Sequence, residues 1–140
     1  MKYNTKIRYG IRAMLEIALD GSAKGVYQKE ISERQRISIK YLDSIISSLK
    51  TAGLITTVRG KKSGYLLTRS PKKISILDIY KAFEPEIAIV DCMSCNFRCE
   101  LSAACAAREF WSGLNESIIM YFKTYTLEDL VVKQKEKELN

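Results

Sequence analysis

The sequence predicts a mainly α-helical fold with one small β-hairpin. Three stretches, around residues 5–20, 38–49 and 103–124, carry apolar side chains at the spacing of amphipathic helices. Between the second and the third, residues 54–58 and 65–68 are rich in β-branched and aromatic side chains and flank a turn-forming segment. The chain has 140 residues, about the length of one domain. No apolar run approaches the roughly 18–20 residues that a membrane span needs, so we expect a globular, cytoplasmic protein without a membrane partner.

The N-terminal half shows the order of a helix-turn-helix followed by a hairpin. A short helix around residues 28–34 precedes a tight turn at Arg36, and Ser38 is then placed as the N-cap of a longer helix. Gly53 is expected at the C′ position, just beyond the end of that helix. The hairpin that follows has a basic tip, residues 59–64. This order is typical of a winged helix-turn-helix.

Basic residues are concentrated in the same half of the chain. Residues 1–75 hold 16 Lys and Arg against 5 Asp and Glu, a net charge of +11. Residues 76–140 hold 7 against 11, a net charge of −4. A basic half with this order of elements indicates a module that binds a polyanion, and double-stranded DNA is the expected partner. We therefore predict a DNA-binding domain over residues 1–75.

The remaining residues, 76–140, are expected to form a linker helix, a cysteine-rich loop and a long dimerisation helix. Two capping boxes of the form Ser/Thr-x-x-Asp, at Ser75 and Thr126, open the linker helix and a last short helix. We expect this last helix to fray into the charged tail, residues 133–140.

The long helix around residues 103–124 has an apolar face too broad for a solvent-exposed helix on so small a domain. Either this face packs entirely on the core of its own chain, or it pairs with a second copy. We favour a homodimer, because small helix-turn-helix proteins gain DNA affinity by reading two half-sites. The residues expected in or beside the two-fold interface are Trp111, Leu114, Ile118 and Tyr121.

All the cysteines of the chain fall within one short segment, residues 92–105, with the spacing C-x₂-C-x₃-C-x₅-C. They are Cys92, Cys95, Cys99 and Cys105. Thiolates are soft ligands that suit iron–sulfur clusters or zinc. No secretory signal precedes them, so a reducing compartment is expected and disulfides are a poor explanation. The alternative is a redox-inert loop that happens to be rich in cysteine, but a metal or cluster site is favoured.

Six motifs occur together between about residues 1 and 130. They are Lys6-x-Arg8-Tyr9-Gly10, Glu30-Ile31-Ser32-Glu33-Arg34-Gln35, Ile37-Ser38-x-x-Tyr41-Leu42, Leu49-Lys50-x-Ala52-Gly53-Leu54, Val58-Arg59-Gly60 and Gly64-Tyr65-x-Leu67. In combination they resemble the Rrf family of bacterial winged-helix transcriptional regulators, whose members include IscR and NsrR. The resemblance implies a homodimer, a long C-terminal dimerisation helix, and a 2Fe-2S or 4Fe-4S cluster held by three cysteines in the loop before that helix.

The resemblance leaves the fourth cluster ligand to be assigned. The three family thiols align with Cys92, Cys99 and Cys105. The chain contains no His, and Arg8 and Arg108 stand at the two places from which relatives draw a fourth ligand. Cys95 is an extra thiol that would complete an all-thiolate site, and the alternative is that Cys95 is a bystander.

The expected DNA contacts lie on the recognition helix, residues 38–49, and on the hairpin tip, or wing. Ser38 at the helix N-terminus can give its hydroxyl and backbone N–H to a phosphate. Lys40 can reach guanine or a phosphate, and Asp43 can accept from a cytosine amino group. Arg59 would enter the minor groove or clamp the backbone, and two added lysines at the tip should strengthen phosphate contact. The full expected set is Ser38, Lys40, Tyr41, Asp43, Ser44, Arg59, Gly60, Lys61 and Lys62. Tyr41 alternatively packs beneath the helix.

These features together predict a homodimeric regulator of transcription whose DNA binding is modulated by an iron–sulfur cluster. The signal would be redox state, iron–sulfur status or nitric oxide. The sequence offers no second cofactor motif, substrate-binding loop or acid–base dyad, which argues against an enzyme. A zinc-stabilised or metal-free DNA-binding repressor without cluster sensing is the alternative.

Overall fold

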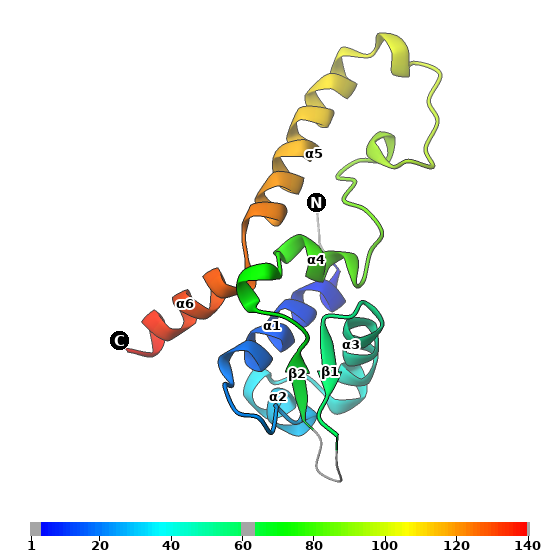
Figure 1. Ribbon diagram of the computed structural model, residues 1–140. Coiled ribbons are helices and arrows are strands. Elements are labelled where there is room, and N and C mark those ends of the chain that lie inside the picture. Colours follow the sequence, from blue (N-terminus) through cyan, green and yellow to red (C-terminus); the bar gives the residue numbers. More distant parts are fainter. Residues whose placement is uncertain (1–3, 60–63, 140) are drawn as a thin grey trace.

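The computed structural model describes residues 4–59 and 64–139 and confirms the mainly helical fold with one two-stranded antiparallel sheet (Figure 1). In chain order the helices and strands are α1 (Thr5–Leu19), α2 (Gln28–Gln35), α3 (Ile39–Thr51), β1 (Ile55–Thr57), β2 (Tyr65–Leu67), α4 (Ile76–Lys81), α5 (Ala106–Thr124) and α6 (Leu127–Glu138). Short 3₁₀ turns occupy Pro71–Lys73, Asp91–Met93 and Ser102–Ala104. Within the two described ranges, no helix is long and apolar enough to cross a membrane.

Helices α1, α2 and α3 form a helical body around one apolar core. The side chain of Asn4 caps α1 by accepting a hydrogen bond from the Ile7 N–H at 3.0 Å. The apolar stripes of the three helices face one another, and the buried side chains at their centre are Ala13, Met14, Ile17, Ile31, Leu42, Ile45 and Leu49. Each large aliphatic side chain buried in this way contributes about 1.5–3 kcal/mol to folding. The burial fixes which face of α3 remains exposed.

The turn between α2 and α3 places Arg36 in the left-handed region, with φ 53° and ψ 48°. The backbone N–H groups of Arg36 and Ile37 both donate to the Ser32 carbonyl, which ends α2. Ser38 then begins α3, its side chain accepting from the Tyr41 N–H at 3.2 Å. The predicted turn at Arg36 and the predicted N-cap at Ser38 are both confirmed.

The hairpin is anchored at its root to the segment between α1 and α2. Val26 and Tyr65 exchange two backbone hydrogen bonds of 3.0 and 2.8 Å, outside the β1–β2 ladder. The two backbones approach so closely that glycine is required on both sides. A Cβ at Gly64 would lie 2.6 Å from the Lys24 carbonyl oxygen. A Cβ at Gly25, whose φ is +74°, would lie 2.7 Å from the Tyr65 carbonyl oxygen.

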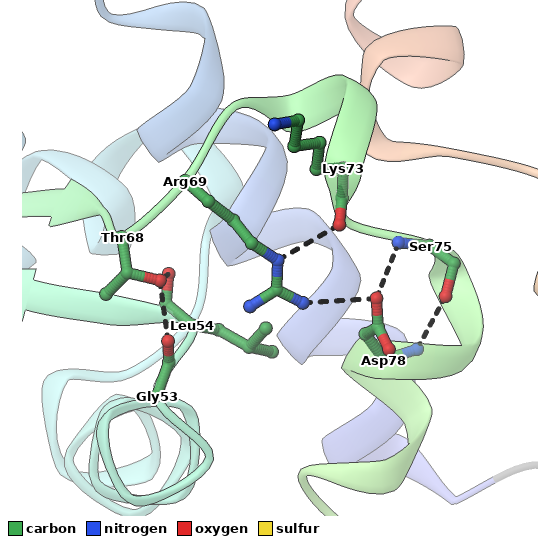
Figure 2. Close-up of polar contacts among 7 residues, drawn as sticks. All are labelled: Gly53, Leu54, Thr68, Arg69, Lys73, Ser75 and Asp78. Atoms are coloured by element: carbon green, nitrogen blue, oxygen red, sulfur yellow. Dashed lines mark hydrogen bonds and ion pairs between the residues drawn. The ribbon is translucent and has the colours of Figure 1, made fainter.

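A polar joint connects β2 to the start of α4 (Figure 2). The Thr68 hydroxyl donates to the carbonyl of Gly53, just beyond the end of α3, at 2.6 Å. Arg69 donates through Nε to the Lys73 carbonyl at 3.0 Å and through its terminal nitrogen to Asp78 Oδ2 at 3.2 Å. The same Oδ2 accepts from the Ser75 N–H, and the Asp78 N–H donates to Ser75 Oγ. The predicted capping box of α4 is thereby confirmed, and it also receives the arginine from the hairpin.

Helix α5 extends away from the helical body, with its C-terminal end nearest to α4 (Figure 1). A second apolar cluster is formed by the buried side chains of Ile7, Tyr80 and Ile87. Three side chains of α5 pack against it, namely Ile118, Ile119 and Phe122. Asn115 is the buried residue of α5. Its Nδ2 donates to the Ile87 carbonyl at 3.0 Å, and its Oδ1 accepts from the Ile89 N–H at 3.0 Å. These bonds fix α5 to the segment that leads into the cysteine loop.

Helix α6 returns to the helical body, where Leu127 and Val131 are buried. The predicted capping box at Thr126 is confirmed by its hydrogen bonds of 2.8 and 3.2 Å. The expectation that residues 133–140 fray is wrong as far as Glu138, because α6 continues through them. Lys, Gln and Glu have high helix propensity, and this favours helix over a charged tail.

Candidate nucleic-acid interface and cysteine loop

Helix α3 lies beside the hairpin (Figure 1), and its exposed face is mostly polar. Its exposed side chains are Ser38 at the N-cap and, along the helix, Ile39, Lys40, Asp43, Ser47, Lys50 and Thr51. The opposite face of the helix is buried in the core. A polar helix face next to a two-stranded hairpin has the geometry of an element that enters the major groove of DNA.

Three of the predicted contact residues at the start of α3 have roles within the fold. The Ser38 hydroxyl caps the helix, yet the residue is exposed. Ser44 Oγ donates back to the Tyr41 carbonyl at 3.0 Å. The ring of Tyr41 packs edge-on against Tyr9 of α1, with centroids 5.5 Å apart and an interplanar angle of 88°. Tyr41 is thus half-buried between α1 and α3. This agrees with the alternative prediction that Tyr41 packs beneath the recognition helix.

Asp43 is exposed, and a neighbouring amide fixes its orientation. Gln28, the first residue of α2, donates through Nε2 to Asp43 Oδ1 at 2.7 Å and to the Ile39 carbonyl at 3.1 Å. The Tyr65 hydroxyl of β2 donates to Gln28 Oε1 at 3.4 Å. Burial raises the pKa of Tyr65, and the nearby negative charge of Asp43 raises it further. The phenol therefore stays protonated and able to donate.

The described part of the hairpin tip ends at Arg59, which is exposed. The other predicted tip residues, Gly60, Lys61 and Lys62, lie outside the described residues. The roles assigned to all four in DNA contact therefore stay predictions.

Gln28 beside this face, and Ile39, Ser47 and Lys50 on it, were not identified from the sequence. Ser47 and Lys50 continue the helical stripe of Lys40 and Asp43, so extending the 3.6-residue period by two turns would have found them. Ile39, with 48% of its surface exposed, is an apolar side chain suited to contact with a thymine methyl group. Gln28 carries no local signal, because its partner on α3 lies fifteen residues away in the chain.

The four cysteines lie in the segment between α4 and α5, where regular structure is confined to two 3₁₀ turns. All four thiols are free, with Cys95 and Cys99 exposed and Cys92 and Cys105 half-buried. Among the residues that the structure describes, no three side chains of Cys, Asp or Glu converge on one metal position. The structure thus brings the four into one loop but does not gather their sulfur atoms.

A carboxylate holds one end of this loop. Glu86 accepts from the Ser94 hydroxyl at 2.8 Å and from the Cys95 N–H at 3.3 Å. These two bonds lower the pKa of Glu86, with the hydroxyl as the larger cause. Glu86 immediately precedes Ile87, whose carbonyl accepts a hydrogen bond from Asn115 of α5. The segment around residues 86 and 87 therefore connects the cysteine loop to α5.

The donor set of the loop suits an iron–sulfur cluster. Thiolates are soft ligands, and the four thiols are accessible and unpaired. A cluster held by all four would require their sulfur atoms to be drawn together from the positions that the structure gives them. Arg8 and Arg108 are both exposed, and neither side chain is a metal ligand.

The outward side of α5 carries a group of exposed apolar side chains. Trp111 is 36% exposed, Leu114 37% and Tyr121 66%, and Phe110 beside them is 65% exposed. Ile118, the fourth residue predicted at a two-fold interface, is half-buried and packs on the second apolar cluster of its own chain. The broad face predicted from the sequence is therefore divided between an inner part that packs on the second apolar cluster and an outer part that is largely exposed.

Comparison with known proteins agrees with these features. The Rrf2 family model, described as an iron-dependent transcriptional regulator, matches residues 3–133. Protein rrf2 of Nitratidesulfovibrio vulgaris is 38% identical over 131 residues, covering 94% of this chain and 87% of that protein. The transcriptional regulator IscR of Xenorhabdus nematophila is 34% identical over 134 residues, covering 96% and 81%.

Solved structures share the whole arrangement. The global cysteine regulator CymR of B. subtilis superposes with a TM-score of 0.79 at 30% identity, covering 95% of this chain and 98% of that one. IscR of T. potens gives a TM-score of 0.79 at 30% identity, covering 98% and 90%. The similarity extends over the helical body, the hairpin and the C-terminal helices, and the relatives are regulators of transcription rather than enzymes. The chain therefore belongs to the Rrf2 family of DNA-binding transcriptional regulators.

Proposed function

We propose that this regulator acts as a homodimer whose binding to operator DNA responds to an iron–sulfur cluster, of the 2Fe-2S or 4Fe-4S type, in the cysteine loop. The observation that carries the proposal is the position of the loop, which holds every thiol of the chain and leads directly into α5. A change in the loop therefore reaches α5 without passing through another element. The signals proposed are redox state, iron–sulfur status and nitric oxide.

Residues 1–75 are assigned to DNA contact. In this assignment the N-terminus of α3, with Ser38 and Lys40, meets the phosphate backbone and the edge of a guanine. Asp43 accepts from a base amino group deeper in the groove. Arg59 at the wing enters the minor groove or clamps the backbone, where Lys61 and Lys62 add phosphate contacts. These contacts position the protein, and the base contacts of α3 give it sequence preference.

Residues 76–140 are assigned to the cluster and the dimer. The outward side chains of Trp111, Leu114 and Tyr121 would meet the same surface of a second copy, as a two-fold axis requires. Their exposure in the single chain supports this assignment, since adjacent exposed aromatic and aliphatic side chains on one helix are typical of an interface. Ile118 would then support the interface from within its own chain.

Cys92, Cys95, Cys99 and Cys105 are assigned as the cluster ligands. A bound cluster supplies iron–thiolate bonds that oxidation or nitric oxide can break. Arg108, in the first turn of α5, follows Cys105 by three residues, and its positive charge would favour an anionic thiolate-bound cluster held there. The bonds from Glu86 to the loop and from Asn115 to Ile87 provide the route to α5. Occupancy changes DNA binding only if it favours one arrangement of the two DNA-reading halves over another.

The experiment that tests this function is anaerobic purification of wild-type protein and of each single Cys→Ala variant. We expect iron and sulfide content and visible absorbance to collapse in the Cys92, Cys99 and Cys105 variants. Ser102→Ala, in the same loop, serves as the matched control and should retain the full content. Loss of the cluster in Cys95→Ala supports the all-thiolate site, whereas an unaltered Cys95→Ala protein would contradict it.

The same preparation distinguishes the alternative function, a zinc-stabilised or metal-free repressor. Zinc is colourless and contains no sulfide, so a colourless protein that binds its operator would overturn the cluster proposal. One observation favours the metal-free form of this alternative: among the described residues, no three potential ligands of the loop converge on one metal position.

A further inference from the structure

Three side chains from three different elements meet between the recognition helix and the hairpin. They are Gln28 of α2, Asp43 of α3 and Tyr65 of β2, joined by hydrogen bonds of 2.7 and 3.4 Å through the amide of Gln28. They line a pocket of about 330 Å³ beside Ser47 and Lys50. Lys50 Nζ lies 6.0 Å from the centroid of the Tyr65 ring. The three side chains therefore form one connected group at the edge of the DNA-facing surface.

The chemistry of the partners fixes the orientation of the amide. The Ile39 carbonyl and the Asp43 carboxylate are both acceptors, so only the NH₂ end of Gln28 can face them. The carbonyl end then faces the Tyr65 hydroxyl, which donates. Each end of the amide thus has a partner of the right kind, and the side chain cannot turn over without losing all three bonds.

The carboxylate of Asp43 is left with one oxygen occupied and one available. Within the described residues, Oδ1 accepts from Gln28 and no hydrogen bond reaches Oδ2. An exposed carboxylate next to DNA is repelled by the phosphates unless it accepts from a base, and the cytosine amino group is the partner that suits it. A carboxylate already held by an amide loses less side-chain entropy when it makes that contact.

We propose that Gln28 is a specificity-determining positioning residue, which aims Asp43 Oδ2 at a cytosine amino group and is itself held by Tyr65. This inference rests on the proposed DNA-reading role of α3 and extends it to a residue outside that helix. Tyr65 also anchors the root of the hairpin through its backbone bonds to Val26. The group thereby links the position of the wing to the side chain that reads a base.

The test uses full-length protein and a duplex selected by the wild-type protein from a randomised pool. Affinities are then measured for that duplex and for its single-base variants at fixed salt. Asp43→Ala should lose about tenfold or more of the preference for cytosine at one base pair of each half-site. Gln28→Met keeps the length of the side chain without its hydrogen bonds, and it should lose about three- to tenfold at the same base pair. Tyr65→Phe should lose less, since it removes only the outer bond.

Base preference distinguishes positioning from a merely structural role. A structural defect would weaken binding to all duplexes alike, whereas the proposal predicts that preferences at the other base pairs and the salt dependence stay unchanged. Gln134→Met, the same substitution on α6, should behave as wild type.

Three outcomes would overturn the inference, and they differ from failure of the proposed function. One is a Gln28→Met protein with wild-type preference at the base pair that Asp43→Ala affects. Another is a Gln28→Met protein whose affinity falls equally for every duplex. The third is an Asp43→Ala protein with unaltered base preference. This result would show that Asp43 does not read a base, although the protein still binds DNA. Failure of the wild-type protein to select any duplex would instead contradict the proposed function itself.

Discussion

Arg36 adopts a backbone conformation that side chains other than glycine rarely occupy. Its φ of 53° and ψ of 48° place it in the left-handed region at the end of α2. For a non-glycine residue this conformation costs about 1–2 kcal/mol, because Cβ crowds the following carbonyl. Helices often end on glycine at such a position. The helix-turn-helix therefore carries a small local strain at its turn.

Replacing Arg36 with glycine should stabilise the protein. We expect the free energy of unfolding of Arg36→Gly to rise by about 0.5–1 kcal/mol, part of the relief being offset by the greater entropy of glycine in the unfolded chain. Urea unfolding followed by circular dichroism measures the change. Glu33→Gly, at an exposed position inside α2, is the matched control and should lose about 1 kcal/mol. A destabilised Arg36→Gly protein would show that the arginine side chain contributes more than its backbone costs.

Sequence reasoning worked well for residues whose partners are close in the chain. The caps at Ser38, Ser75 and Thr126 were predicted because the acceptor and the donor lie three residues apart. It did not find Gln28, whose partner on α3 is brought near only when two helices and a strand pack together. It also could not decide whether Tyr41 faces solvent, since that depends on the position of Tyr9.

At the scale of elements, the joint in Figure 2 connects the hairpin to α4. Asp78 Oδ2 accepts both the Ser75 N–H and the Arg69 guanidinium, whereas Arg69 also has the Lys73 carbonyl. The side chains of Arg69 and Asp78 are 38% and 41% exposed. An ion pair this exposed is screened by water, so the helix cap is the larger of the two contributions of Asp78.

Asp78→Ala should therefore cost more than Arg69→Ala. We expect a loss of about 1 kcal/mol or slightly more for the aspartate, which removes the ion pair and the half of the capping box that accepts the Ser75 N–H, and a smaller loss for the arginine. A double-mutant cycle of unfolding free energies, with the Arg69→Ala/Asp78→Ala protein as its fourth member, measures their coupling. A coupling above about 2 kcal/mol would mean that the joint, and not the cap, holds α4 in place.

The order and type of the elements followed from the sequence, but their ends did not always. The long helix was expected from about residue 103, but α5 begins at Ala106, and residues 103 and 104 belong to the separate 3₁₀ turn Ser102–Ala104. α6 runs to Glu138 through residues expected to fray. Both differences lie where periodicity is weak and where packing against α1 or the loop decides the boundary. The conformation of the cysteine loop could not be predicted, because it has neither a regular period nor a buried stripe.

At the scale of the whole molecule, the exposed side of α5 should form the dimer interface. Leu114→Glu places a charge in an apolar seam at a side chain that is in neither apolar cluster of its own chain, so we expect soluble, folded monomers. Tyr121→Glu should also give monomers, although it additionally removes the contact of the Tyr121 ring with Tyr125. Sedimentation equilibrium measures the mass. Met120→Glu is the matched control, because Met120 is also exposed but lies about a third of a turn around the helix from Leu114. Ile118→Glu is a poorer test, since Ile118 packs on its own chain.

Two results would contradict this assignment of the interface. If both Leu114→Glu and Tyr121→Glu remain dimeric like the wild-type protein, the outward side of α5 is not the dimer interface. A Met120→Glu protein that dissociates as readily as Leu114→Glu would place the interface on the other side of the helix.

If the cysteine loop controls DNA binding, the affinity of the protein for its operator must depend on whether the loop holds a cluster. The affinity of anaerobically purified wild-type protein for its selected duplex is measured before and after the cluster is removed with a chelator, at the same salt concentration. A coupling of the usual size, about 1–3 kcal/mol, corresponds to a change in affinity of roughly 5- to 150-fold, and we expect a change in this range. Equal affinities for the two forms would contradict the account, because the loop would then carry a cluster that the DNA-reading helices do not sense.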